Sequence, residues 1–163
     1  MKNYTAPHGE SEKTVLSNLE EMLPLIEECL SAGQSVKFSP RGISMLPMLV
    51  QGRDSVTISP APKKLKKFDI PLYRRANGSF VLHRVVKVEQ TYTCVGDNQI
   101  AYEHGVTHES VIGVVSSFNR NGKDISVTNP WYMMYCRFWC GTRIFRRIWR
   151  GLKRRVKKII KRK

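Results

Sequence analysis

A serine and a histidine of this chain are candidates for nucleophilic catalysis. Ser44 lies in Gly42-Ile43-Ser44-Met45-Leu46-Pro47, just after a short β-prone segment, and His83 lies among the apolar residues of Phe80–Val86. A serine hydroxyl is a weak nucleophile at neutral pH and needs an adjacent base. Histidine suits that role, because its ordinary pKa lets it take the serine proton and return it to a leaving amine. The backbone N–H of Ser44 is the expected donor to the oxyanion of the intermediate.

Further segments, in a particular order, strengthen this interpretation. The segments that follow the serine are Gly52–Ile58, Lys67–Arg74, Phe80–Val86, Cys94–Asn98 and Val111–Val115. Together with the Ser-Met-x-Pro sequence, their types and order resemble the signal peptidase I and LexA-like serine peptidases. His83 is followed by Arg84, as in the endoplasmic-reticulum, archaeal and sporulation-type signal peptidases, whereas most bacterial enzymes have lysine as the base. The resemblance covers about residues 35–115, roughly half of the chain.

The resemblance also implies an oxyanion hole and an acid beside the histidine. Many signal peptidases carry a serine two residues before the nucleophile, but Gly42 stands there, as in LexA-like members, and offers no side-chain donor. In the histidine type an acid follows the Gly-Asp-Asn turn, and Glu103 stands at that position, where Asp is usual. Asp97 is the alternative, either as the residue that orients His83 or as a brace for the turn. Phe68 departs from the pattern, because glycine is usual there.

The hydrophobic pattern predicts a mainly β protein with a helix at each end. Apolar residues at helical spacing predict an amphipathic helix over Ser11–Ala32, which Gly33 ends and Pro24 kinks or splits. Two Asn-Gly sequences, at Asn77 and Asn121, predict hairpin turns. The predicted strands are Val36–Phe38, Ser55–Ile58, Ile70–Arg74, Ser79–Val88, Tyr92–Val95, Val111–Phe118 and Ile125–Val127. Many short strands with turns between them predict a twisted, mostly antiparallel β-sheet domain, which is also the fold that the resemblance implies.

The positive charge of the chain is concentrated at its C-terminal end. Of the formal charge of +15 on 163 residues, the last 27 residues carry +13, since they hold 13 Lys or Arg and no acid, and the first 136 carry the remaining +2. From Phe145 to Ile160 the apolar residues form one stripe of a predicted helix, and basic residues fill its other faces. This pattern is typical of a helix that lies in a membrane interface. We therefore expect an N-terminal helical segment (1–34), a β-rich peptidase-like domain (35–130) and a basic membrane-binding tail (131–163).

Other classes of site and segment are not expected. The first ten residues hold no apolar region of the kind found in secretory signals, and no stretch reaches the length needed to span a bilayer. Cys136 and Cys140 are four residues apart, as are His104 and His108, but no Cys-x-x-Cys sequence accompanies them. We therefore expect neither a metal site nor a cofactor.

Two functions are compatible with these features. The first is a Ser/His endopeptidase that removes a leader or signal segment from a polypeptide, as a peripheral protein on the cytoplasmic face of the plasma membrane. The resemblance implies that substrates bind as extended strands, with small residues before the cleaved bond. The alternative is a LexA-like self-cleaving or non-catalytic regulatory module whose tail binds nucleic acid. The apolar aromatic face of the tail, and the lack of a helix-turn-helix pattern, favour the first function.

Overall fold

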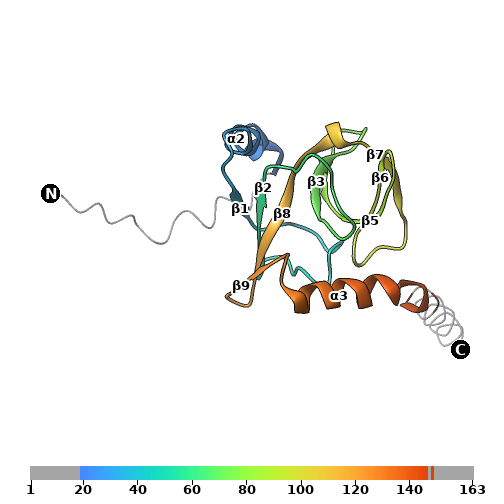
Figure 1. Cartoon of the computed structure of the whole chain (residues 1–163). Coiled ribbons are helices and arrows are strands. Elements are labelled where there is room, and N and C mark those ends of the chain that lie inside the picture. The colour runs from blue at the N-terminus through green and yellow to red at the C-terminus, as the bar shows by residue number, and fades with distance from the viewer. Residues whose placement is uncertain (1–18, 147, 149–163) are drawn as a thin grey trace, which may run out of the picture.

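Two antiparallel sheets, α-helices and a short 3₁₀ helix (His108–Ser110) make up the part of the fold that the structure describes (Figure 1). The structure, a computed structural model, describes residues 19–146 and 148. The elements are α2 (Leu19–Ser31), β1 (Val36–Phe38), β2 (Ser55–Ser59), β3 (Pro71–Arg74), β4 (Phe80–Leu82), β5 (Arg84–Val88), β6 (Tyr92–Val95), β7 (Glu103–Val106), β8 (Val111–Arg120), β9 (Lys123–Ser126) and α3 (Pro130–Gly141). The predicted mainly β, antiparallel class is confirmed.

The first sheet is organised around the long strand β8. Its strands follow the order β1-β2-β8-β3-β4, and β9 also pairs with β8. Asn77-Gly78 joins β3 to β4, and Asn121-Gly122 joins β8 to β9. Both glycines have a positive φ, of 84° and 78°, as tight hairpin turns require. The two hairpins predicted from the Asn-Gly sequences are therefore confirmed.

The second sheet, β5-β6-β7, begins where we expected a strand to continue. The predicted strand Ser79–Val88 is divided at His83: β4 belongs to the first sheet and β5 to the second. The alternation of apolar and polar residues continues across such a change of sheet. It depends on which side chains are buried, and not on which strand is the partner. The prediction of one strand was therefore wrong, and strand β7 was not predicted at all.

Helix α2 covers one side of the first sheet. Ile26 and Leu30 are buried in the main apolar cluster. Gly33 has a φ of 77° and its N–H donates to the carbonyl of Leu30 at 3.0 Å, which ends the helix as predicted. The helix runs on through the exposed Pro24, so it is not split there. The predicted residues before Leu19 lie outside the described part.

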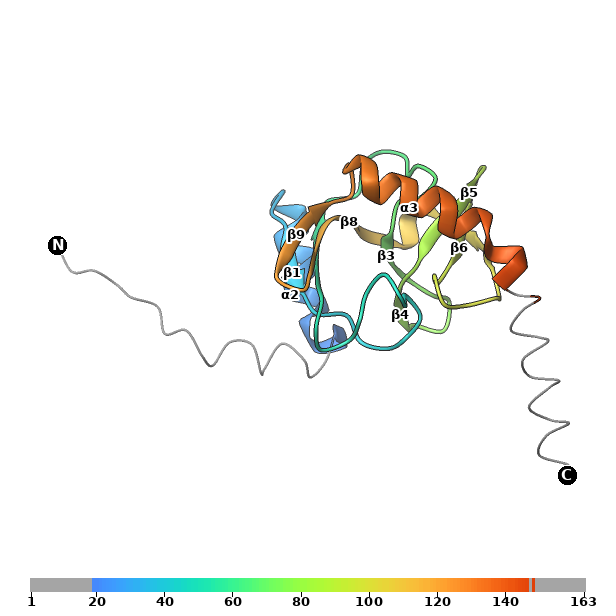
Figure 2. The ribbon, with the colours of Figure 1, turned by 90° about the horizontal axis from the view of Figure 1, so that it is seen from below.

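Helix α3 packs on the body of the protein, across the end of the strands away from α2 (Figure 2). The Asn129 side chain caps it, and Pro130 stands in its first turn. Tyr132 and Cys136 of α3 are buried in the same cluster as Ile26. The first helical turns of the segment that we expected to form the tail therefore pack in the core. Residues 147 and 149–163 of that tail lie outside the described part.

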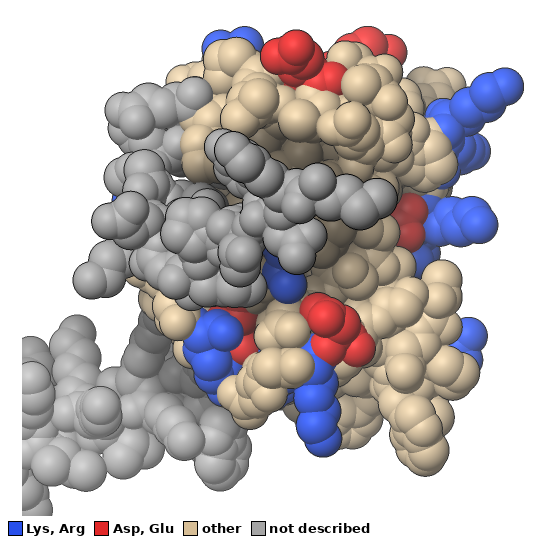
Figure 3. Space-filling model, turned by 90° about the vertical axis from the view of Figure 1, so that its left-hand side faces the viewer, with Lys and Arg blue, Asp and Glu red and all other residues tan. Residues whose placement is uncertain are grey.

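The surface of the body has a mixed charge. On the face shown in Figure 3, basic and acidic side chains lie interspersed among uncharged ones. This agrees with the formal charge of only +2 on the first 136 residues. Within residues 19–146 and 148, no helix is both long and apolar enough to cross a bilayer.

Candidate active site

His83 stands at the point where the chain passes from one sheet to the other. Leu82 pairs with Leu72 of β3, and Arg84 pairs with Val95 of β6. His83 itself lies between these two strands and is only 1 % exposed. Both neighbours are held by backbone pairing, so the imidazole is fixed by two sheets at once.

Glu103, the first residue of β7, holds one edge of the His83 ring. Its Oε1 lies 2.9 Å from His83 Nδ1. The hydroxyl of Tyr73 donates to Glu103 Oε2 at 2.8 Å, and Arg75 Nε donates to the same oxygen at 2.9 Å. A second guanidinium nitrogen of Arg75 forms an ion pair with Oε1. A carboxylate that accepts from Nδ1–H leaves Nε2 of His83 without the proton, as a general base requires.

Burial favours the neutral form of His83, and hydrogen bonds favour the ionised form of Glu103. Burial lowers the pKa of His83 below its ordinary value; Glu103 opposes this effect, and the positive charge of Arg75 adds to it. Burial acts to raise the pKa of Glu103, but the hydrogen bonds from Arg75 and Tyr73 prevail and lower it to about 2. A neutral imidazole beside a carboxylate is the state from which a histidine can take a proton at neutral pH.

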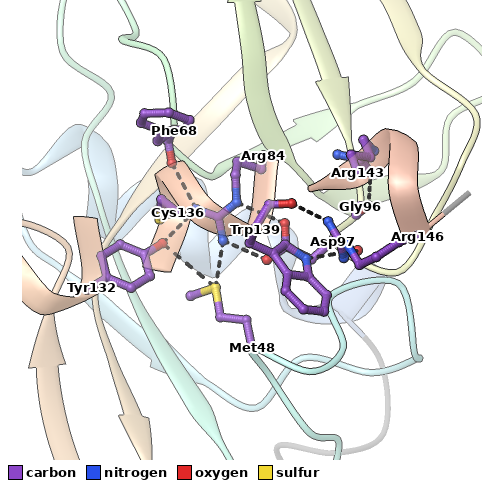
Figure 4. Close-up of polar contacts among 10 residues, drawn as sticks. All are labelled: Met48, Phe68, Arg84, Gly96, Asp97, Tyr132, Cys136, Trp139, Arg143 and Arg146. Atoms are coloured by element: carbon purple, nitrogen blue, oxygen red, sulfur yellow. Dashed lines mark hydrogen bonds and ion pairs between the residues drawn. The ribbon is translucent and has the colours of Figure 1, made fainter. Parts of the chain in front are cut away.

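Asp97 lies in a different environment from Glu103. Its two carboxylate oxygens accept from Arg84 at 2.8 and 2.7 Å, and both side chains are fully buried (Figure 4). Arg84 also donates to Tyr132 of α3 at 2.8 Å and to the carbonyl of Phe68 at 3.2 Å. Of the two acids that the sequence left open, Glu103 therefore lies on the histidine, and Asp97 braces the turn and the helix.

Ser44 packs against the other side of the same turn. Its carbonyl accepts from Asn98 N–H at 2.8 Å. A Cβ built on Gly96 would lie 2.7 Å from that carbonyl oxygen and 3.1 Å from Ser44 Cβ, so only glycine fits there. Gly96 directly follows Val95, the residue that pairs with Arg84, so the turn that contacts Ser44 adjoins the strand pair that begins next to His83.

The hydrogen bonds of Ser44 leave its reactive groups available. In the described part of the chain, no hydrogen bond joins Ser44 to His83, and none is donated by the Ser44 backbone N–H. In structures without a substrate, catalytic hydrogen bonds are often long and tighten only in the complex. Gly42 has a φ of 90°, and its N–H donates to the side chain of Gln51 at 2.7 Å, so this backbone group is already engaged.

An apolar cavity of about 250 Å³ opens beside Ser44. Its walls are formed by large apolar side chains from the first sheet, the Ser44 turn and α2, which include Phe38, Met45, Leu72 and Met22. Ser39 and Gln51 add polar groups. A cavity of this kind beside a nucleophile accommodates a small or apolar side chain of a substrate.

Two residues of the site were not predicted from the sequence, and a third residue was identified only as a departure from the family pattern. Tyr73 and Arg75 hold Glu103, but Tyr73 stands in an ordinary strand pattern and Arg75 directly follows that strand, so no sequence signal marks either residue. Phe68, which stands where the resemblance leads one to expect glycine, has a φ of 81°. That backbone region is rarely occupied by a residue other than glycine, so the conformation is of the kind that glycine would adopt.

Comparison of the chain with models of protein families, with curated proteins and with solved structures finds no match.

Proposed function

We propose that the chain is a serine endopeptidase of the signal-peptidase type, with Ser44 as nucleophile and His83 as general base. The observation that carries the proposal is the carboxylate of Glu103, which lies 2.9 Å from Nδ1 of the buried His83. A nucleophile, a base and a third group that orients the base form the general arrangement of covalent catalysis by serine. Glu103 supplies the third group in place of aspartate.

In this mechanism each group has a separate task. The Oγ of Ser44 attacks the peptide carbonyl while Nε2 of His83 takes its proton. The charge of Glu103 stabilises the imidazolium that forms, and the Ser44 N–H donates to the oxyanion. Nε2 then gives the proton to the leaving amine. A water molecule, activated by the same nitrogen, hydrolyses the acyl-enzyme and restores the serine.

The proposed substrate is a leader or signal segment bound as an extended strand. An extended peptide gains main-chain hydrogen bonds from a strand edge, and a pocket beside the nucleophile selects one of its side chains. The cavity beside Ser44 is lined mainly by apolar side chains, which favours a small or apolar residue near the cleaved bond.

The test is cleavage of leader peptides by the full chain in lipid vesicles, followed by mass spectrometry. We expect Ser44→Ala and His83→Ala each to lower the rate by roughly a thousandfold or more. Matched controls are Ser126→Ala, which alters an exposed serine of β9, and His104→Ala, on the exposed side of β7. Both controls should cleave like the wild type.

The proposal fails if the wild type cleaves no peptide, or if the Ser44→Ala protein cleaves at the wild-type rate. Cleavage of the chain itself and of nothing else would instead support the self-cleaving regulatory alternative.

A further inference from the structure

The outer face of α3 exposes a row of large apolar side chains. Trp131, Met134 and Phe138 follow a spacing of three and four residues, which places them on one face of the helix, while Tyr132 and Cys136 are buried on the other. Beyond Gly141, three further large apolar residues are exposed. The complete set is 57–77 % exposed and consists of Trp131, Met134, Phe138, Ile144, Phe145 and Ile148.

The size of this apolar surface is unusual for a face that contacts only water. From the usual areas of aromatic side chains, Trp131, Phe138 and Phe145 alone expose roughly 300–500 Å². That equals the largest apolar patch on a typical monomer, which often has a function. Trp and Phe are also the residues expected on the inserted side of a helix that lies at a membrane surface.

Arg143, which lines a small cavity beside Ile144 of this face, has unused guanidinium donors. Arg143 is 8 % exposed, and one of its nitrogens donates to the carbonyls of Gly96 and Gln99 at 2.6 and 2.8 Å. Its Nε and Nη1 are buried and have no hydrogen-bond partner among the described residues. They belong to a side chain that lines a cavity of about 40 Å³, together with Tyr102 and the exposed Ile144.

This cavity is suited to an anion. The nearest acid in its wall, Asp97, is already paired with Arg84. Its volume takes roughly three water molecules, which is also enough for the oxygens of one phosphate group. A guanidinium donates through several nitrogens in one plane, a geometry that matches phosphate oxygens.

We propose that the outer face of α3 and the Arg143 cavity together bind an anionic phospholipid bilayer. The apolar row enters the interface, and a lipid phosphate accepts from Nε and Nη1 of Arg143. Charge complementarity favours this partner over others, because α3 leads into the last 27 residues of the chain, which begin at Arg137 and carry +13. The proposed membrane contact thus lies on a helix of the folded body and not only in the tail. It does not depend on peptidase activity.

The test is flotation of the full chain with vesicles of phosphatidylcholine, with and without phosphatidylglycerol, in the absence of any substrate. A triple variant, Trp131→Ser with Phe138→Ser and Phe145→Ser, changes only exposed residues and no charge. We expect it to lower the partition coefficient by roughly tenfold or more. Leu25→Ser, which alters an exposed leucine of α2, is the matched control and should bind like the wild type.

A second variant addresses the phosphate cavity. Arg143→Lys keeps the charge and removes the planar donors. We expect it to lower the partition coefficient several-fold on vesicles of either composition, because both lipids carry a phosphate, with thermal unfolding as the check that the protein folds.

Several outcomes would overturn the proposal. One is equal binding of anionic vesicles by the triple variant and the wild type. Another is binding of DNA or of inorganic phosphate without binding of vesicles. A third is self-association that the triple variant abolishes, without vesicle binding, which would identify a second copy of the chain as the partner. A protein that binds vesicles but cleaves nothing would refute the peptidase and leave this proposal standing.

Discussion

The substitution Gly96→Ala should displace Ser44, the proposed nucleophile. The new Cβ would lie 2.7 Å from the carbonyl oxygen of Ser44, whereas Cβ contacts under 3.0 Å are essentially never seen. Ser44 must therefore retreat by at least the 0.3 Å that separates these two distances. The clash is with backbone, which cannot rotate away as a long side chain can. The φ of Gly96 is not in the left-handed region, so the substitution tests steric fit alone.

The expected magnitudes follow from the contact. Overpacking of this kind costs about 1–3 kcal/mol, and the lower chain entropy of alanine in the unfolded state offsets a few tenths to 1 kcal/mol of that. We therefore expect the free energy of unfolding to fall by about 1–2 kcal/mol. A misplacement of about 1 Å in an active site costs roughly a hundredfold in rate. A shift of several tenths of an ångström should thus lower kcat by roughly tenfold.

The assay combines urea unfolding with leader-peptide cleavage by the folded protein. Two glycines serve as controls. Gly113→Ala puts a Cβ 2.9 Å from Leu30 and 3.0 Å from the carbonyl of Ser59, so it should destabilise the fold without lowering kcat. Gly141→Ala meets nothing within 4 Å and should be neutral or slightly stabilising.

The reasoning is refuted if Gly96→Ala leaves kcat unchanged. It is also refuted if Gly113→Ala lowers kcat as much as Gly96→Ala, because the effect would then reflect general destabilisation.

Four further predictions concern the charged groups. Glu103→Gln should lower kcat by roughly 10²- to 10⁴-fold and move the acid limb of the pH–rate profile to lower pH, because Glu103 raises the pKa of His83. Arg75→Gln should move that limb to higher pH, because Arg75 lowers the same pKa; shifts in the same direction would contradict both assignments. The pKa of Glu103 falls from 4.5 to about 2 on folding, so its contribution to stability is complete above pH 4.5 and is lost as the pH falls towards 2. Unfolding free energies measured across that window should fall more steeply for the wild type than for Glu103→Gln. Asp97→Asn leaves the buried charge of Arg84 without a counter-charge and should cost about 3–5 kcal/mol in urea unfolding; a loss below about 1 kcal/mol would refute the bracing role.

Local signals predicted the parts of the fold that local physics determines. An Asn-Gly pair favours a tight hairpin wherever alternating segments flank it, and both such hairpins formed. Gly33 ends α2 because its backbone adopts a positive φ at little cost. These features depend on a few neighbouring residues, so the sequence contains the information needed to find them.

The missed features depend on contacts between distant parts of the chain. His83 separates two strands because Leu82 and Arg84 pair with strands of different sheets. The alternation of apolar and polar residues contains no information about which sheet a residue joins. Arg84 is fully buried, although arginine is normally a surface residue, because Asp97 satisfies its charge. The choice between Glu103 and Asp97 could not be made from sequence for the same reason: it rests on which basic or imidazole group each carboxylate meets.

The Arg84 guanidinium bonds to Tyr132 of α3. The folded part of the chain therefore extends past the point at which the amino-acid composition changes. The composition changes after residue 136, because the 27 residues that follow are rich in Lys and Arg and contain no acid. The contacts cross that point: Trp139 donates to the carbonyl of Asp97 at 3.1 Å, and Arg143 donates to the carbonyl of Gly96. A chain shortened at residue 136 would lose these supports of the turn beside Ser44 along with its basic stretch. Such a truncation measures the integrity of the fold, and only substitutions on the outer surface of α3 isolate its role in binding.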